Sequence, residues 1–155
     1  MLNDRIAMMA LTSLPSLDCT DTKLHQLARV VAHYYDAELG KVGLGTTQYS
    51  LLTEVLSHGP MRPCDLAEAM SLSPSTLTRS LKPLIVTGWL ALAPGIDGRT
   101  RSVSITAAGR RKCAEGLPRW NSAQARVHQL LGGRNVSAMH ALLEDCSARM
   151  SATNP

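Results

Sequence analysis

One stretch of the chain, residues 71–106, constrains the fold more than any other. Ser73 followed by Pro74 is typical of a helix N-terminus, because a serine hydroxyl accepts a free backbone N–H and a proline at the first helical position has none to satisfy. Leucines then recur at helical spacing until Gly88, where the pattern predicts that the helix ends. The same periodicity separates a buried leucine face from a face of small hydroxyls and cations.

Two short apolar runs, residues 89–92 and 102–105, follow this helix and predict the strands of a hairpin. The loop between them contains Asp97, Arg99 and Arg101, and Gly98 permits a sharp turn at the tip. An arginine at such a tip can enter the DNA minor groove, where narrow A·T stretches concentrate negative potential. We expect Asp97 and Arg101 to pair across the hairpin and to stiffen it.

A shorter helix is predicted just upstream, at residues 64–70, with a turn at residues 71–72. Two short helices joined by a tight turn form a helix-turn-helix, whose second helix lies in the DNA major groove with its N-terminal side chains at base edges. The predicted DNA-binding residues are Ser73, Ser75, Thr76, Thr78, Arg79 and Lys82 of the helix and Asp97, Arg99 and Arg101 of the hairpin. Serine and threonine also simply solvate surface helices, and the following hairpin favours the DNA interpretation over that one.

Helical periodicity extends on both sides, so the predicted fold class is mainly α (α+β). Thr20 or Asp21 is expected to cap a first helix, Thr46 or Thr47 a second, Thr106 a long helix that contains Pro118, and Asn135 the last helix. Apolar residues of the first and last helices recur at intervals of three and four, which predicts either a dimer interface or an intramolecular bundle. The predicted organisation is an extension (1–19), a dimerisation helix (20–45), a winged helix-turn-helix (46–106) and C-terminal dimerisation helices (107–155), in one compact domain.

Composition narrows the class of protein. The chain has 155 residues and a net charge of +4, a mild basic bias that suits a polyanionic partner. Its apolar runs are too short to span a membrane, and the N-terminal apolar patch is shorter than a signal-peptide core. The four cysteines are widely spaced, which favours free thiols over disulfides. These features predict a cytoplasmic protein without a membrane partner.

The segments SPSTLTRSLKPLIVTGWL, the DGRTR loop and VSITAAGR occur in an order and spacing that resemble the MarR family of bacterial winged-helix regulators. The resemblance covers the chain from about Asp21 onward. It implies a homodimer with interlocked N- and C-terminal helices and two wings on a palindromic double-stranded operator. It also implies a repressor that is released by a small molecule or by thiol oxidation, with no cofactor.

The effector has several candidate sites. In the hydroperoxide-sensing branch of that family a cysteine near the start of the first helix is the sensor, and Cys19 lies at about that place, although its local motif, CTDT, differs. Cys64 is a second candidate, since a helix cap beside Arg62 favours the thiolate, but it could equally be a serine-like cap. We expect Cys113 and Cys146 to be core thiols. A ligand pocket could be lined by Arg29, His33, Tyr35 and Trp120, each of which could instead be a packing or surface residue.

The sequence gives less support to an enzyme, a metal-binding protein or a protein-interaction module. The sequence has none of the metalloprotease, hydrolase or phosphate-binding motifs that would indicate an enzyme. The five histidines have no tight metal-ligand spacing, so no metal site is predicted. A winged helix that binds protein instead of DNA is the alternative function. An arginine-tipped wing argues against it, and the salt dependence of duplex binding would separate the two.

Overall fold

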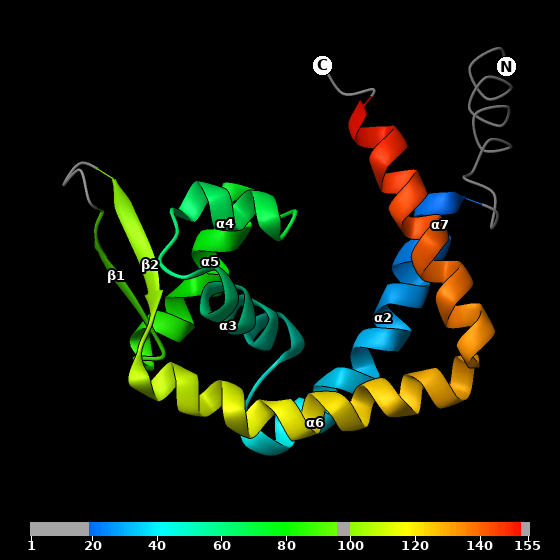
Figure 1. Cartoon of the computed structure of the whole chain (residues 1–155), viewed down its shortest axis with the longest axis horizontal. Coiled ribbons are helices and arrows are strands. Elements are labelled where there is room, and N and C mark those ends of the chain that lie inside the picture. Colours follow the sequence, from blue (N-terminus) through cyan, green and yellow to red (C-terminus); the bar gives the residue numbers. More distant parts are fainter. Residues whose placement is uncertain (1–18, 96–99, 153–155) are drawn as a thin grey trace, which may run out of the picture. The chain divides into compact units, whose positions relative to one another are not determined.

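The computed structural model describes residues 19–95 and 100–152, and Asp97 and Arg99 lie outside these ranges. Its elements are α2 (Thr20–Leu39), the 3-10 turn η1 (Gly40–Val42), α3 (Thr46–His58), α4 (Pro63–Ala69), α5 (Pro74–Val86), β1 (Leu90–Pro94), β2 (Arg101–Ile105), α6 (Ala107–Leu131) and α7 (Gly133–Ala152). Within the described ranges, no helix is both long and apolar enough to cross a membrane. The predicted class is confirmed, since a winged helix is combined with long helices (Figure 1).

Backbone contacts divide the chain into two compact units, Met1–His33 and Tyr34–Pro155. The described part of the first unit is the start of α2. The carbonyl of Cys19 accepts the N–H of Lys23 at 3.1 Å, so Cys19 occupies the N-cap. The predicted caps, Thr20 and Asp21, are therefore wrong, because both residues are already helical.

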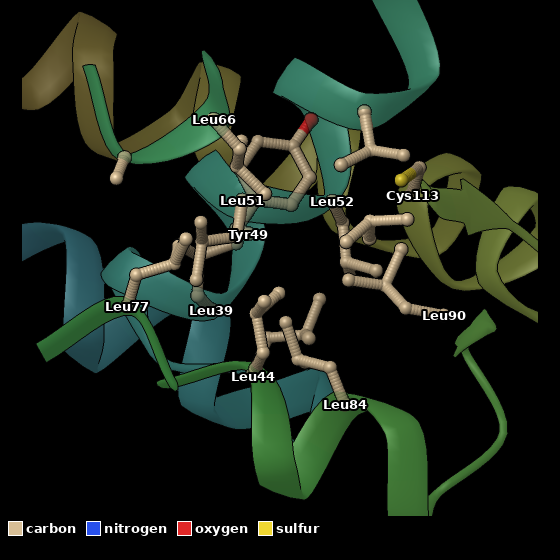
Figure 2. Packing of buried hydrophobic residues seen from close by; sticks show 14 residues of the cluster. Leu39, Leu44, Tyr49, Leu51, Leu52, Leu66, Leu77, Leu84, Leu90 and Cys113 are labelled. Carbon is tan, nitrogen blue, oxygen red and sulfur yellow. The ribbon is translucent and has the colours of Figure 1, made fainter. Parts of the chain in front are cut away.

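The core of the second unit is a cluster of aliphatic side chains around Tyr49 (Figure 2). Every element of the winged helix contributes to it, as do the end of α2 and the start of α6. Its fully buried members are Leu39, Leu51, Leu52, Val55, Leu66, Leu77, Leu84, Leu90 and Val103. Leucine and valine are the residues that fill such interiors without leaving a polar atom unsatisfied. This shared core holds α5 and the hairpin together as one unit.

The hairpin is antiparallel, with Leu90 opposite Ile105 and Pro94 opposite Arg101. Met61 adds a single rung on the other side of β2, exchanging hydrogen bonds of 3.1 and 2.8 Å with Val103. The predicted strands are confirmed, with shifts of one or two residues at the strand ends. Because Met61 lies just before α4, the rung ties the start of the helix-turn-helix to the wing.

The helix start predictions for α3 and α7 were wrong. Gly45 is the N-cap of α3, and the hydroxyl and N–H of Thr46 both donate to the Asp36 carboxylate, at 2.6 and 2.7 Å. A cap from a residue ten positions away replaces the expected local one. In α7, Asn135 lies inside the first turn and its side chain donates to the carbonyl of Leu131 at 2.8 Å.

The predicted caps of α5 and α6 are confirmed. Ser73 accepts the N–H of Thr76 at 3.2 Å, and Thr106 accepts the N–H of Gly109 at 3.0 Å. The turn before α5 contains Ser71 at φ 51°, a left-handed conformation that is uncommon for a residue with a side chain. It lets the Ser71 N–H reach the carbonyl of Glu68 at 2.9 Å and close α4.

The long helix α6 leads from the hairpin to α7 and contains Pro118, as predicted (Figure 1). Two of its glycines allow close packing. A Cβ at Gly109 would overlap the carbonyl of Trp89, and one at Gly116 would lie 2.6 Å from the Tyr49 ring. The described part of α7 is mostly exposed in the single chain, including Cys146, so that thiol lies outside the core of the single chain. Cys113 is buried, as expected.

Candidate nucleic-acid interface

Helix α5 has one buried face and one exposed face. Leu77, Leu81 and Leu84 are buried in the core. The exposed set is Ser73, Ser75, Thr76, Thr78, Arg79 and Lys82, which are all the helix positions predicted to contact DNA. The structure therefore brings these six side chains together on one accessible surface. Leucines at helical spacing produce this arrangement, because they fix the rotation of the helix about its own axis.

Three hydroxyls are clustered where α5 begins. The Ser73 hydroxyl oxygen, besides accepting the Thr76 N–H, lies 2.9 Å from the Thr76 hydroxyl and 3.2 Å from that of Ser75. Two further contacts form one turn later. The Thr78 hydroxyl donates to the carbonyl of Pro74 at 2.8 Å, and the Arg79 Nε–H donates to that of Ser75 at 3.3 Å. These bonds orient the polar side chains before any ligand arrives.

The base of the wing is well defined. The N–H of Gly95 donates to the carbonyl of Thr100 at 2.6 Å and closes the described part of the hairpin. Arg101, the first residue of β2, is exposed. Its proposed pairing with Asp97 and the position of Arg99 fall outside the described residues, so the predicted brace stays a prediction.

Arg101 lines a groove of about 440 Å³ between the wing and the start of α4. Arg62 and Asp65 line the same groove. The Arg62 guanidinium donates two hydrogen bonds of 2.8 Å to the Asp65 carboxylate, which holds the pKa of Asp65 below its usual value. Sequence reasoning missed this pair, although an arginine three residues before an aspartate at a helix start is a recognisable signal. The pair and Arg101 give the groove one excess positive charge.

Cys64 does not occupy the predicted N-cap, because α4 begins at Pro63 and Arg62 is its N-cap. Its thiol is exposed and donates to the Asp65 carboxylate at 3.5 Å. The neighbouring Arg62 is engaged by the same carboxylate. Arg62 and the Cys64 thiol thus bond to the same carboxylate.

Cys19 has the environment that was expected of Cys64. The backbone N–H of Thr22 hydrogen-bonds to the thiol, and so does the Thr22 side chain. These contacts lower the pKa of Cys19, because they stabilise the thiolate more than burial and Asp21 oppose it. The thiol is partly accessible to solvent.

Of the residues proposed to line a ligand pocket, the structure brings two together. The rings of Tyr35 and Trp120 are 6.2 Å apart with an interplanar angle of 48°. The Tyr35 hydroxyl donates to the side-chain carbonyl of Gln124, and burial raises the pKa of Tyr35. His33 and Arg29 belong to the first unit and are exposed. Gln124, which sequence reasoning did not single out, connects onward to His128 at 2.6 Å.

The comparisons with known proteins find similarity to transcriptional regulators. A model described as the MarR family matches residues 44–91, which include the helix-turn-helix. The uncharacterised HTH-type transcriptional regulator YwoH of Bacillus subtilis is 29% identical over 93 residues, covering 60% of this chain and 68% of that protein.

Solved structures agree in fold. The regulator MosR of Mycobacterium tuberculosis is 27% identical, with a TM-score of 0.72 over 85% of this chain and 98% of its own. A mutant MarR from Escherichia coli, complexed with operator DNA, is 19% identical, with a TM-score of 0.74 over 79% of this chain and 89% of its own. At that identity the second likeness shows the fold alone. The helix-turn-helix of this chain therefore matches the MarR family model over residues 44–91, and the chain is similar in fold to solved MarR.

Proposed function

We propose that this chain binds double-stranded operator DNA as a homodimer and represses transcription until a signal releases it. The observation that carries the proposal is the exposed face of α5, which presents Arg79 and Lys82 together with serine and threonine hydroxyls. The opposite face of the helix is buried in the core. Fixed cations and hydroxyls at this spacing match the phosphates and base edges of a major groove. The relatives that were solved with DNA support the same function.

The test of DNA binding is its dependence on salt. Each phosphate contact releases condensed counterions, so the logarithm of the association constant should fall with the logarithm of salt concentration by about 0.9 per contact. Fluorescence anisotropy of a labelled genomic duplex, measured at several salt concentrations, gives this slope. A flat response, or no binding, would contradict the proposal and favour the protein-interaction module.

Exposed apolar side chains support the dimer. In α7, Leu142 is 64% exposed, Leu143 42% and Met150 73%, and in the start of α2 Leu24 is 49% exposed. Solvent-facing apolar side chains on each of these helices are typical of surfaces that another protein covers. The resemblance to the MarR family makes a second copy of the chain the expected partner.

The dimer is tested by sedimentation or light scattering of the full chain. Leu142→Glu places a charge in the proposed interface and should shift the protein towards the monomer. Val86→Glu is a matched control, because Val86 is 78% exposed but lies at the end of α5. Equal dissociation of both variants, or of neither, would contradict this interface.

Release by thiol oxidation is favoured by one observation, the lowered pKa of Cys19 at the start of α2. A larger thiolate fraction reacts faster with peroxide, which converts the thiolate to a sulfenic acid. Release by a small molecule is the second candidate, favoured by the aromatic pair of Tyr35 and Trp120. Screening release from the duplex with peroxides and with phenolic acids separates the two.

A further inference from the structure

The exposed side chains of α5 differ in which of their hydrogen-bonding groups are already used within the protein. The hydroxyls of Ser73 and Thr76 hydrogen-bond to each other, and Ser73 also caps the helix. A side chain that already satisfies a helix terminus would have to give up that bond to read a base. These two residues therefore position the helix and are poor candidates for sequence readout.

The Thr78 hydroxyl is hydrogen-bonded to the backbone of its own helix. Its hydroxyl hydrogen is donated to the carbonyl of Pro74 at 2.8 Å, inside the helix. The exposed residue can then offer a duplex its γ-methyl group and the remaining lone pairs of the hydroxyl oxygen. In the major groove, thymine is the base that presents a methyl group of its own, and threonine methyls make apolar contact with it.

The Arg79 guanidinium is hydrogen-bonded within the helix through Nε. Its Nε–H donates to the carbonyl of Ser75, which draws the side chain towards the start of the helix. In the described part of the chain its two Nη groups make no hydrogen bond or ion pair. Two parallel N–H donors match the O6 and N7 acceptors of guanine, which no other base presents as a pair in the major groove.

Lys82 lies one turn further along the same face and is exposed. Its ammonium is a compact charge on a flexible stem, which suits a phosphate better than a patterned base edge. Phosphate contacts position a protein on DNA but carry no direct sequence information. The base-reading capacity of α5 is thus concentrated in two adjacent residues, Thr78 and Arg79.

We infer that Thr78 and Arg79 specify the operator, with Arg79 taking a guanine and Thr78 packing its methyl group against the methyl of a nearby thymine in each half-site. This inference rests on the proposed DNA-binding function and names the sequence feature that the interface selects. Of the four exposed hydroxyl residues, Ser75 and Thr76 contact the hydroxyl of Ser73 at 3.2 and 2.9 Å, and Thr78 is the one assigned to read a base.

The experiment begins with duplexes that the full-length protein enriches from a random pool. In the enriched duplex each thymine is replaced in turn by deoxyuridine, which lacks only the methyl group, and each guanine by 7-deazaguanine, which lacks N7. Affinities are measured by anisotropy for the parent chain and for Thr78→Ser, which keeps the hydroxyl and removes the methyl. Thr76→Ser is the matched control on the same face.

Replacing one thymine in each half-site by deoxyuridine should lower the affinity for the duplex about fourfold. This is the effect expected when one apolar carbon is no longer buried. That loss should vanish in Thr78→Ser and persist in Thr76→Ser. One guanine should show a loss of roughly five- to 150-fold on replacement, the range of a bidentate contact. Arg79→Met keeps an unbranched side chain without a donor and should remove that sensitivity.

Two other results would overturn the inference. If deoxyuridine has no effect at any thymine, or if Thr78→Ser retains the full loss, Thr78 does not read a methyl group. If Arg79→Met, which has no donor, responds to 7-deazaguanine as the parent does, Arg79 does not read guanine. Tight duplex binding with these results leaves the DNA-binding function intact, whereas a protein that enriches and binds no duplex contradicts that function and this inference together.

Discussion

The hydroxyl of Thr106 donates to the carbonyl of Gly88 at 2.7 Å, across eighteen residues of chain. The same oxygen accepts the N–H of Gly109 at the start of α6. Because Gly88 lies between α5 and β1 and Thr106 follows β2, this hydroxyl joins the two ends of the hairpin to the long helix. One side chain thus connects the proposed reading helix, the wing and α6.

Thr106→Ala should destabilise the chain by about 0.5–2 kcal/mol, the usual effect of removing a helix cap. It also removes the bond to Gly88, which places the expected loss towards the upper end of that range. The free energy of unfolding is measured by urea denaturation at a fixed protein concentration. Thr106→Ser retains the hydroxyl and should stay close to the parent, and a loss of equal size in both variants would assign the effect to the methyl group.

Gly116→Ala should destabilise the packing of α6 on α3. The added Cβ would lie 2.6 Å from the ring of Tyr49 and 3.2 Å from Leu44, and both neighbours are buried. Alanine gains up to about 1 kcal/mol in helix propensity over glycine, but overpacking costs about 1–3 kcal/mol. A lowered melting temperature is expected. Gly133→Ala has open space around the new Cβ and should be neutral or stabilising.

Arg99→Ala should weaken binding to every duplex, specific or not, because an arginine at a wing tip contacts backbone and minor groove. The salt slope should fall by about 0.9 for each phosphate contact that is lost. Arg126→Ala removes the same charge from α6 and serves as the control. Unchanged affinity and slope in Arg99→Ala would show that the wing assignment is wrong.

Cys19 should react with iodoacetamide with a lower pH midpoint than an ordinary exposed thiol. The direction follows from its lowered pKa, since the thiolate is then populated at lower pH. Thr22→Val removes one of the stabilising hydrogen bonds and should move the midpoint upward. Cys113, whose pKa is raised by burial, should react slowly and with a higher midpoint. Peptide mass spectrometry distinguishes the thiols.

The functional consequence is tested with peroxide. If Cys19 is the sensor, Cys19→Ser should stay on the duplex at peroxide concentrations that release the parent chain. Release that is the same in both proteins would move the sensing role to Cys64 or to a bound ligand. Cys64→Ser, measured in parallel, decides between those two.

Much of the winged helix could be predicted from the sequence, because its signals are local. The Ser73-Pro74 start, the leucine spacing of α5 and the glycine after it all act within a few residues of each other. The same locality explains why the six predicted DNA-facing residues of α5 are found on one exposed surface. Helical periodicity decides which side chains share a face, whatever else the chain does.

Some helix starts could not be predicted from the sequence. Thr46 looked like a cap, but the distant Asp36 supplies the bonds at the start of α3. Cys64 looked like the cap of α4, whereas the neighbouring Arg62 is its N-cap. In each case a local pattern offered several acceptable caps, which differ little in intrinsic preference.

The sequence by itself therefore determined the order of the elements, the hydrophobic face of each helix and the set of side chains available to DNA. These properties follow from backbone geometry and from spacing along the chain. Only the tertiary structure decided that Tyr35 meets Trp120 and that Thr106 ties α6 to Gly88. Both contacts join residues far apart in the chain, so they depend on how the helices pack and not on local spacing.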